Sequence, residues 1–233
     1  MKKAVLITGV SGGIGDAVAR KFAEMGWNIV GTYNRNEVLE ELAVFCHEKG
    51  VEMVKMQLDI TCSADVKKVF EDAFNEQNIE CVVCNSGISL GEKMLCDISD
   101  EDIAKLVQTN LIGTLYCNRE ASKLLMEKRK GEIINISSVY GVNGGSCEAT
   151  YSATKAGINA LTMSLAKELE CAGVKVNAVA PGFVETKMTA CFSEEEKEEI
   201  RQNGEMSVLK PEDVAQFVFD ITKQDVSGKI FVI

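Results

Sequence analysis

The sequence predicts an α/β fold in which a doubly wound, seven-stranded parallel sheet carries helices on both faces. Short runs that are apolar on both faces alternate along the chain with longer segments of helical, amphipathic spacing. Parallel strands buried between two layers of helices have this pattern. The composition also fits, because 46% of the 233 residues are hydrophobic and 26% are charged, as in folded globular domains. No repeat, linker or low-complexity segment interrupts the pattern, so we predict one domain over residues 1–233.

The elements can be assigned in order along the chain. Strands are expected at residues 3–8, 28–33, 52–59, 80–85, 132–137, 175–180 and 229–233. Helices are expected near residues 14–25, 36–49, 63–76, 100–129, 151–171 and 211–222. Pro211 suits the first position of the last helix, where a missing N–H costs little. The charged run "SEEEKEEI" is expected to form a solvated helix in a mobile substrate loop over about 184–206.

The composition disfavours several classes of function. The formal net charge of −10 argues against nucleic acid or an anionic membrane as the main partner. No apolar run approaches the roughly 18 residues of a membrane span. The start "MKKAVLITGV" has too short an apolar run for a signal peptide and no small-residue cleavage site after it. A cytoplasmic protein is therefore expected.

Histidine and cysteine usage narrows the chemistry further. His47, the single histidine, lies in the polar stretch "FCHEKG", so Ser-His-Asp and Cys-His mechanisms and a histidine metal site are not expected. Nine scattered cysteines without a secretory signal indicate reduced thiols. Cys81 and Cys84 form a C-x-x-C, but in a buried strand they point to opposite faces. We interpret them as small core residues rather than a redox dithiol.

A glycine-rich turn, "TGVSGGIG", follows the first expected strand. Its glycines permit a tight turn, close approach of the backbone to a pyrophosphate and close packing of helix on strand. The N–H groups of the next helix then point at the phosphates. The spacing is G-x-x-x-G-x-G, but its place between strand and helix favours a Rossmann-type dinucleotide site over a plain turn. The expected contacts are Gly9, Ser11, Gly12, Gly13, Ile14 and Gly15.

The tip of the second strand, "VGTYNRNE", bears on the choice of dinucleotide. Sites for NAD usually place Asp or Glu there to bind the ribose 2′-hydroxyl. Here Asn34 and Arg35 follow Tyr33, and a guanidinium group suits a 2′-phosphate. We therefore predict NADP(H), with NAD(H) as the alternative, because Arg35 can equally be a surface residue. Gly12 stands where many NADPH-dependent enzymes carry a second basic residue.

The third strand ends at "MQLDI", which is expected to lie near the adenine. Asp59, next to Ile60, is expected either to accept a hydrogen bond from the adenine amino group or to cap the helix that begins near Ser63.

The stretch "YSATK" suggests acid–base chemistry. Tyrosine has an unperturbed pKa near ~10, but Lys155 lies four residues after Tyr151 and therefore on the same helical face. Its charge is expected to lower the pKa of Tyr151 towards working pH, so that the phenol can exchange a proton with a carbonyl oxygen. Ser138, at the end of the expected strand "EIINISS", can hydrogen-bond the same oxygen. Asn110, in "TNLIGT", can hold a water that relays protons from Lys155.

Together these features resemble the short-chain dehydrogenase/reductase family along essentially the whole chain. The matching segments are "TGVSGGIG", "CNSG" (where the family usually has N-N-A-G), "YSATK" and "VNAVAPGFVETKM", together with Asn110 and Ser138. The resemblance implies an NAD(P)-dependent oxidoreductase. By that resemblance, Ser138 stabilises the substrate oxygen, Tyr151 is the general acid/base, and Lys155 lowers the pKa of Tyr151 and binds ribose.

The resemblance also implies supporting positions around the site. Asn110 supports the proton relay. The adenosine side is implied to include Asn85, Ser86 and Gly87. The nicotinamide is implied to be bordered by Pro181, Gly182, Val184 and Thr186. Substrate contacts are implied for Ser138, Val139, Tyr140, Glu148, Tyr151 and Gly182.

Within the family the chain looks most like the 3-oxoacyl-acyl carrier protein reductases, on "NAVAPGFVETKMT" and on length. That group implies NADPH-dependent reduction of a small or carrier-borne ketone to a secondary alcohol (EC 1.1.1.-), in fatty acid biosynthesis. The run "SCE" just before the tyrosine instead resembles bacterial reductases of a 5-aminopentanone modification on elongation factor P. Glu148 would then meet a substrate ammonium, or it only complements the helix dipole. Cys147 is equally explained as a small packed residue.

Other hypotheses remain open from the sequence. One is an alcohol or hydroxysteroid dehydrogenase. Another is an NADP-sensing regulator without turnover, which the presence of both Tyr151 and Lys155 disfavours. The family also implies a homo-oligomer, a dimer or tetramer, in which the helices at 100–129 and 151–171 pair with their copies. After "SGKIFVI" the family's usual Gly-Gly-containing tail is missing, which fits either a shortened chain or a pocket left open for a bulky substrate.

Overall fold

The predicted fold class is confirmed by the computed structural model, which describes residues 2–34, 39–190, 192–203 and 206–233. Its main sheet has seven parallel strands in the order β3-β2-β1-β4-β5-β6-β9. The strands are β1 (Ala4–Thr8), β2 (Asn28–Tyr33), β3 (Met53–Gln57), β4 (Ile79–Cys84), β5 (Gly131–Ile136), β6 (Val174–Ala180) and β9 (Ile230–Val232). Each lies within a residue or two of its expected position, because its apolar run is bounded by polar or glycine residues.

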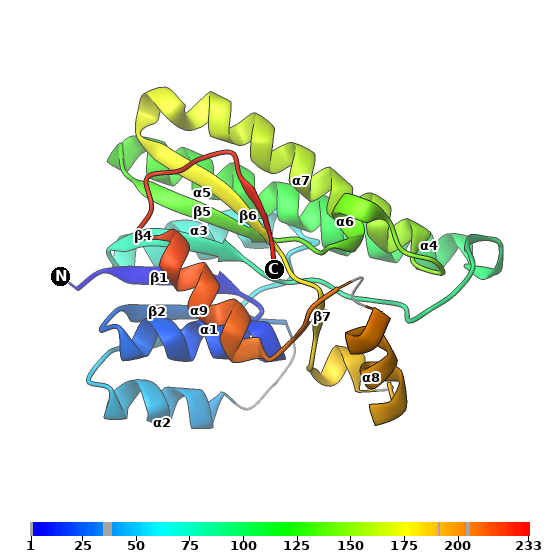
Figure 1. Ribbon diagram of the computed structural model, residues 1–233. Coiled ribbons are helices and arrows are strands. Elements are labelled where there is room, and N and C mark those ends of the chain that lie inside the picture. The colour runs from blue at the N-terminus through cyan, green and yellow to red at the C-terminus, as the bar shows by residue number, and fades with distance from the viewer. Residues whose placement is uncertain (1, 35–38, 191, 204–205) are drawn as a thin grey trace.

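Helices cover both faces of the sheet (Figure 1). One layer consists of α1 (Gly13–Glu24), α2 (Glu40–Glu48) and α9 (Pro211–Ile221). The other contains α3 (Ser63–Glu76), α5 (Thr114–Lys128) and α7 (Ala149–Leu169). Each layer has its own apolar core against the sheet, around Phe22 in the first and around Phe70 in the second. The sheet is therefore buried on both faces, which explains why its strands are apolar throughout.

The prediction of one long helix over 100–129 is wrong in detail, because three elements occupy this segment. They are α4 (Asp100–Val107), the π-helical turn η2 (Gln108–Gly113) and α5. The hydroxyl of Thr114, the first residue of α5, donates to the carbonyl of Asn110 in the π-helical turn over 2.7 Å. A Cβ on Gly113 would stand 2.9 Å from side-chain atoms of Ile60. Helical spacing alone does not show such an insertion, which often marks a functional site.

Several short elements were not predicted. They are α6 (Tyr140–Asn143), three 3₁₀ turns η1 (Leu95–Asp97), η3 (Glu170–Ala172) and η4 (Lys187–Thr189), and a small sheet that pairs β7 (Phe183–Val184) with β8 (Val208–Leu209). Elements of two to four residues are too short to show a period. The helix expected in "SEEEKEEI" is present as α8 (Glu194–Asn203). The mobility of its loop stays a prediction, as does the single-domain assignment.

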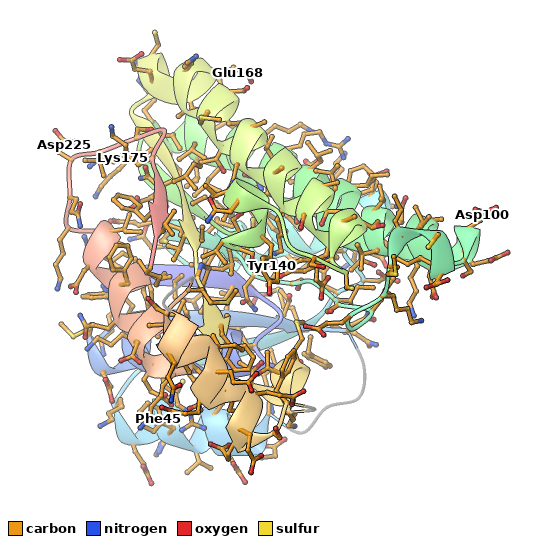
Figure 2. The ribbon with its side chains drawn as sticks, turned by 45° about the vertical axis from the view of Figure 1, so that its right-hand side comes forward. Phe45, Asp100, Tyr140, Glu168, Lys175 and Asp225 are labelled. Carbon is orange, nitrogen blue, oxygen red and sulfur yellow. The ribbon has the colours of Figure 1, made fainter. Side chains whose placement is uncertain are left out.

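The strand order reverses between β1 and β4, because β2 and β3 follow on one side and β5, β6 and β9 on the other. Ligands of open α/β sheets bind outside the carboxyl ends of the strands at such a switch point. In Figure 2, Tyr140 lies away from the ion pair of Lys175 and Asp225, which marks the opposite, amino edge at the start of β6. The topology therefore predicts a ligand site at the edge near Tyr140.

The fold bears on two possible partners of the chain, a membrane and further copies of itself. In the described part of the chain, no helix is long and apolar enough to cross a membrane. The pairing of α5 and α7 with copies of themselves stays a prediction. The large apolar side chains that such pairing would cover include Leu115 and Met126 on α5 and Met163 on α7, which are 39%, 45% and 45% exposed.

Candidate active site

A cleft of about 610 Å³ lies at the carboxyl edge of the sheet, at the switch point. The site residues expected from the sequence that line it are Gly9, Ser11, Gly12, Gly13, Ile14, Asn34, Ile60, Asn85, Ser86, Gly87, Ser138, Tyr151, Lys155, Pro181, Gly182, Val184 and Thr186. Those that do not line it are Gly15, Asp59, Asn110, Val139, Tyr140 and Glu148. Arg35 lies outside the described residues. The turn, the strand ends and the start of α7 thus come together in one place.

The glycine turn is held against β4 by a side-chain amide. Gly9 has a φ of +75°, which glycine adopts without strain. The Nδ2 of Asn85 donates to the carbonyl of Gly9 over 2.9 Å and to that of Thr8 over 3.1 Å. A Cβ on Gly15 would stand 2.1 Å from the Gly9 carbonyl oxygen. Gly15 therefore lets helix and turn touch, although it does not line the cleft.

The first turn of α1 is open to the cleft and suits a phosphate. Gly12 precedes the helix in an extended conformation with a φ of −114°. Apart from its chain neighbours, no described residue has an atom within 4 Å of where a Gly12 Cβ would be. A Cβ on Gly13 would stand 2.6 Å from the Cγ2 of Thr186. The bare backbone leaves room for a ligand at the helix N-terminus, where unpaired N–H groups and the helix dipole favour an anion. The residues present therefore fit a dinucleotide pyrophosphate.

Lys155 is buried at the end of β5. It is 5% exposed, and its Nζ donates to the carbonyl of Ile136 over 2.9 Å. The same Nζ lies 5.5 Å from the centre of the Tyr151 ring, as expected for residues one helical turn apart. Ser138, two residues after β5, shares a side-chain hydrogen bond with Tyr151. The three side chains expected to react are thus neighbours.

The expected lowering of the Tyr151 pKa is wrong for the ligand-free protein. Burial raises the pKa of Tyr151 to about 12, the charge of Glu148 adds to this, and the hydrogen bond from Ser138 only partly opposes it. Burial also lowers the pKa of Lys155 from 10.5 to about 8. Desolvation is the largest cause of both shifts, because it disfavours the charged form of each group. Tyr151 is therefore a protonated acid at neutral pH.

Asn110 holds the backbone of Ile88, a residue that lines the cleft. It is fully buried in the π-helical turn, where its Nδ2 donates to the carbonyl of Ile88 and its Oδ1 accepts from the N–H of Ile88, both over 2.8 Å. A Cβ on Gly87 would stand 3.2 Å from the Asn110 Oδ1 and 3.9 Å from the Lys155 Nζ. The side chain of Asn110 is thus committed to Ile88, and its part in a proton relay stays a prediction.

Asp59 does not cap α3, so that alternative is wrong. Its Oδ1 accepts from the N–H of Thr61 over 2.9 Å and from the hydroxyl of Thr61 over 2.7 Å. The residue before α3 is Cys62, which makes no side-chain cap bond. The neighbours Leu58 and Ile60 line the cleft, and an adenine contact of Asp59 stays a prediction. The carboxylate shapes this loop through Thr61.

Glu148 lies half-buried directly before α7 without capping it. Burial and the nearby charge of Glu92 raise the pKa of Glu148 to about 7. Its own charge also raises the pKa of Tyr151. The carboxylate is therefore close to Tyr151 and costly to ionise there, although it does not line the cleft.

The two cysteines of the C-x-x-C belong to the core, as interpreted from the sequence. Cys81 is 1% and Cys84 is 4% exposed. Burial raises the pKa of the Cys84 thiol to about 12, so it stays an unreactive thiol.

Some residues of the cleft were missed by sequence reasoning. Those not expected there are Thr32, Tyr33, Leu58, Ile88, Thr109, Ile136, Ser137, Lys187, Met188 and Thr189. Half of them lie at the carboxyl end of a strand, and this position is the signal that could have found them: Thr32, Tyr33, Leu58, Ile136 and Ser137. Lys187, Met188 and Thr189 form the 3₁₀ turn η4. An element of three residues is too short to give a periodic pattern in the sequence.

The fold and its glycine turn at the switch point define a dinucleotide-binding α/β protein of Rossmann type. A family model described as short chain dehydrogenase matches residues 3–197. The chain therefore belongs to the short-chain dehydrogenase/reductase family and is an oxidoreductase, as its sequence resemblance indicates.

Individual relatives match most of the chain. A 3-oxoacyl-[acyl-carrier-protein] reductase FabG from Rickettsia felis is 37% identical over 218 residues, which are 93% of this chain and 87% of that protein. The protein of the same name from Aquifex aeolicus is 37% identical over 222 residues, 93% of this chain and 88% of the relative. A solved structure described as ElxO with NADP bound has a TM-score of 0.86 and 29% identity, and covers 100% of this chain and 97% of that one.

The close approach of Gly15 to Gly9 predicts a large effect of one methyl group. Gly15→Ala is expected to lower the free energy of unfolding by at least about 2 kcal/mol, because the new Cβ meets a backbone atom that cannot move aside. Gly12→Ala is the matched control and is expected to change it by less than about 0.5 kcal/mol. Urea unfolding without ligand measures both. Equal stabilities of the two variants would contradict the packing role of Gly15.

Burial of Lys155 predicts a pH dependence of stability. The pKa of Lys155 is about 8 when folded against 10.5 ordinarily, so between these values the unfolded chain binds more protons and stability rises with pH. Below pH 8 the cost of burying the cation is present in full. Lys155→Met is expected to raise the free energy of unfolding at pH 7 by about 1–3 kcal/mol.

The measurement is urea unfolding from pH 7 to pH 10, with Lys49→Met as the control for an exposed lysine. The Lys155 variant should lose the rise above pH 8 that the wild type and the control keep. An unchanged rise in the Lys155 variant would show that another group titrates there.

Proposed function

We propose that the protein is an NADPH-dependent ketone reductase that uses Ser138, Tyr151 and Lys155. The observation that carries the proposal is that all three line the cleft that also contains the glycine turn. A dinucleotide whose pyrophosphate lies on the turn would extend along the carboxyl edge of the sheet. Its far end would then lie beside α7, where Tyr151 and Lys155 are.

The chain's own groups have distinct roles in the proposed reaction. When bound, the nicotinamide supplies a hydride to the carbonyl carbon. Tyr151 gives its phenolic proton to the carbonyl oxygen, and the Ser138 hydroxyl hydrogen-bonds the same oxygen as it becomes an alkoxide. Lys155 places a cation near the phenol, which stabilises the phenolate that remains. The raised pKa of Tyr151 suits reduction, because the tyrosine starts in the protonated form.

NADP(H) is proposed as the cofactor on two grounds. Asn34 lines the cleft at the tip of β2, where a carboxylate would be expected for NAD. The similar structures of ElxO are described with NADP and with NADPH bound.

The proposed substrate is a 3-oxoacyl thioester, in line with the relatives named as 3-oxoacyl-[acyl-carrier-protein] reductases. The test is the absorbance at 340 nm of NADPH mixed with the protein and a 3-oxoacyl thioester. Tyr151→Phe should reduce turnover by about 10²- to 10⁴-fold, because it removes the proton donor. Binding of NADPH, measured by calorimetry, should be retained.

Two outcomes would contradict this proposal. If Tyr151→Phe keeps the wild-type rate, the proton comes from elsewhere. If the wild type binds NADPH but turns over neither this thioester nor an amino-ketone, the hypothesis of a cofactor-sensing regulator gains support.

A second candidate substrate is an amino-ketone, which one feature favours. Glu148 is half-buried beside Tyr151, and Glu92 adds a second negative charge. A substrate ammonium would relieve this repulsion and hold the carboxylate ionised. In the parallel assay, Glu148→Gln should raise the KM of an amino-ketone about 10-fold and leave that of a neutral thioester unchanged. An equal effect on both substrates would show that Glu148 only shapes the helix start.

A further inference from the structure

The cleft differs in charge from the rest of the molecule. The chain has 35 acidic residues and a formal net charge of −10. None of the described residues that line the cleft is Asp or Glu, and the charged ones are Lys155 and Lys187. An acid-free, cationic cleft in an acidic protein favours an anionic ligand. Lys155 is already bound to the carbonyl of Ile136 at the tyrosine end, which leaves Lys187 without an assigned role.

Lys187 is held next to the phosphate-binding turn. Its neighbour Thr186 packs on the start of α1, since a Cβ on Gly13 would stand 2.6 Å from the Thr186 Cγ2. The exposed side chain of Lys187 begins η4. It makes no ion pair or hydrogen bond with any described residue. The ammonium group, on its flexible stem, is therefore free to turn towards the N-terminus of α1.

The segment that carries Lys187 is fixed by its own hydrogen bonds. The Thr189 hydroxyl donates to the carbonyl of Val184 over 2.7 Å and accepts from the N–H of Thr186 over 3.0 Å. The Thr186 hydroxyl in turn accepts from the N–H of Met188 over 3.2 Å. This reciprocal capping holds the backbone of Lys187 in one place beside the cleft.

We propose that the ammonium group of Lys187 binds the pyrophosphate of the dinucleotide, opposite the N–H groups of α1. The inference rests on the proposed dinucleotide site. The ribose 2′-phosphate is the other candidate anion, but it would lie at the tip of β2 by Asn34, whereas Lys187 is placed beside Gly13. Lys187 is thus a binding residue that serves NADH and NADPH alike.

The experiment measures dissociation constants by calorimetry for NADPH, NADH and ADP-ribose, which has the pyrophosphate but no nicotinamide. Lys187→Gln should weaken all three by a similar factor of about 3 to 10, the range for one partly solvated charge-assisted hydrogen bond. Lys187→Arg should restore most of the affinity. Lys49→Gln is the control, because it removes the same charge at an exposed position after α2, beside the amino edge of the sheet where β3 begins. It should change none of the constants.

Salt provides a second readout. The dissociation constants of the wild type should rise more steeply with ionic strength than those of Lys187→Gln, because one phosphate contact is lost. Weakening of NADPH alone would overturn the assignment in favour of the 2′-phosphate. Unchanged constants in Lys187→Gln would overturn it altogether. Failure of the wild type to bind any of the three ligands would instead refute the proposed function on which the inference rests.

Discussion

The rest of the site depends on the burial of the Lys155 ammonium group against the carbonyl of Ile136. A buried cation is costly unless it is hydrogen-bonded, so neighbouring elements must approach it closely. A Cβ on Gly141 would stand 2.7 Å from Lys155 backbone and side-chain atoms, and one on Gly87 would stand 3.9 Å from its Nζ. Gly141, in α6, thus lets the chain pack directly against Lys155, where a Cβ would clash. The hydrogen bond from Lys155 to Ile136 joins α7, which also carries Tyr151, to the end of β5.

Burial of Tyr151 itself determines the protonation state of the tyrosine. Burial reduces the hydration of both groups, so the pKa of Tyr151 rises to about 12 while that of Lys155 falls to about 8. A simple attraction between a phenolate and an ammonium would have moved both values the other way. The ligand-free protein therefore holds a proton on Tyr151. That is the state which the proposed reduction of a ketone requires.

The sequence was sufficient for the main sheet, its helices and most of the cleft. Apolar runs and helical spacing locate them, and parallel topology brings every strand end to one edge. It was insufficient where a position depends on three-dimensional contacts. Nothing in "TNLIGT" shows that Asn110 sits in a π-helical turn with its amide on Ile88, and the loop role of Asp59 depends on Thr61. The sign of the Tyr151 pKa shift depends on burial, which spacing along a helix does not reveal.

The most direct test of this account is an ultraviolet titration of tyrosinate near 295 nm. The difference between the ligand-free wild type and Tyr151→Phe reports the ionisation of Tyr151 alone. The account predicts no difference signal from pH 7 to pH 10, because burial keeps the phenol protonated with a pKa of about 12. A tyrosinate signal that appears between pH 7 and pH 8 would contradict it, and would show that the lysine charge outweighs the loss of water.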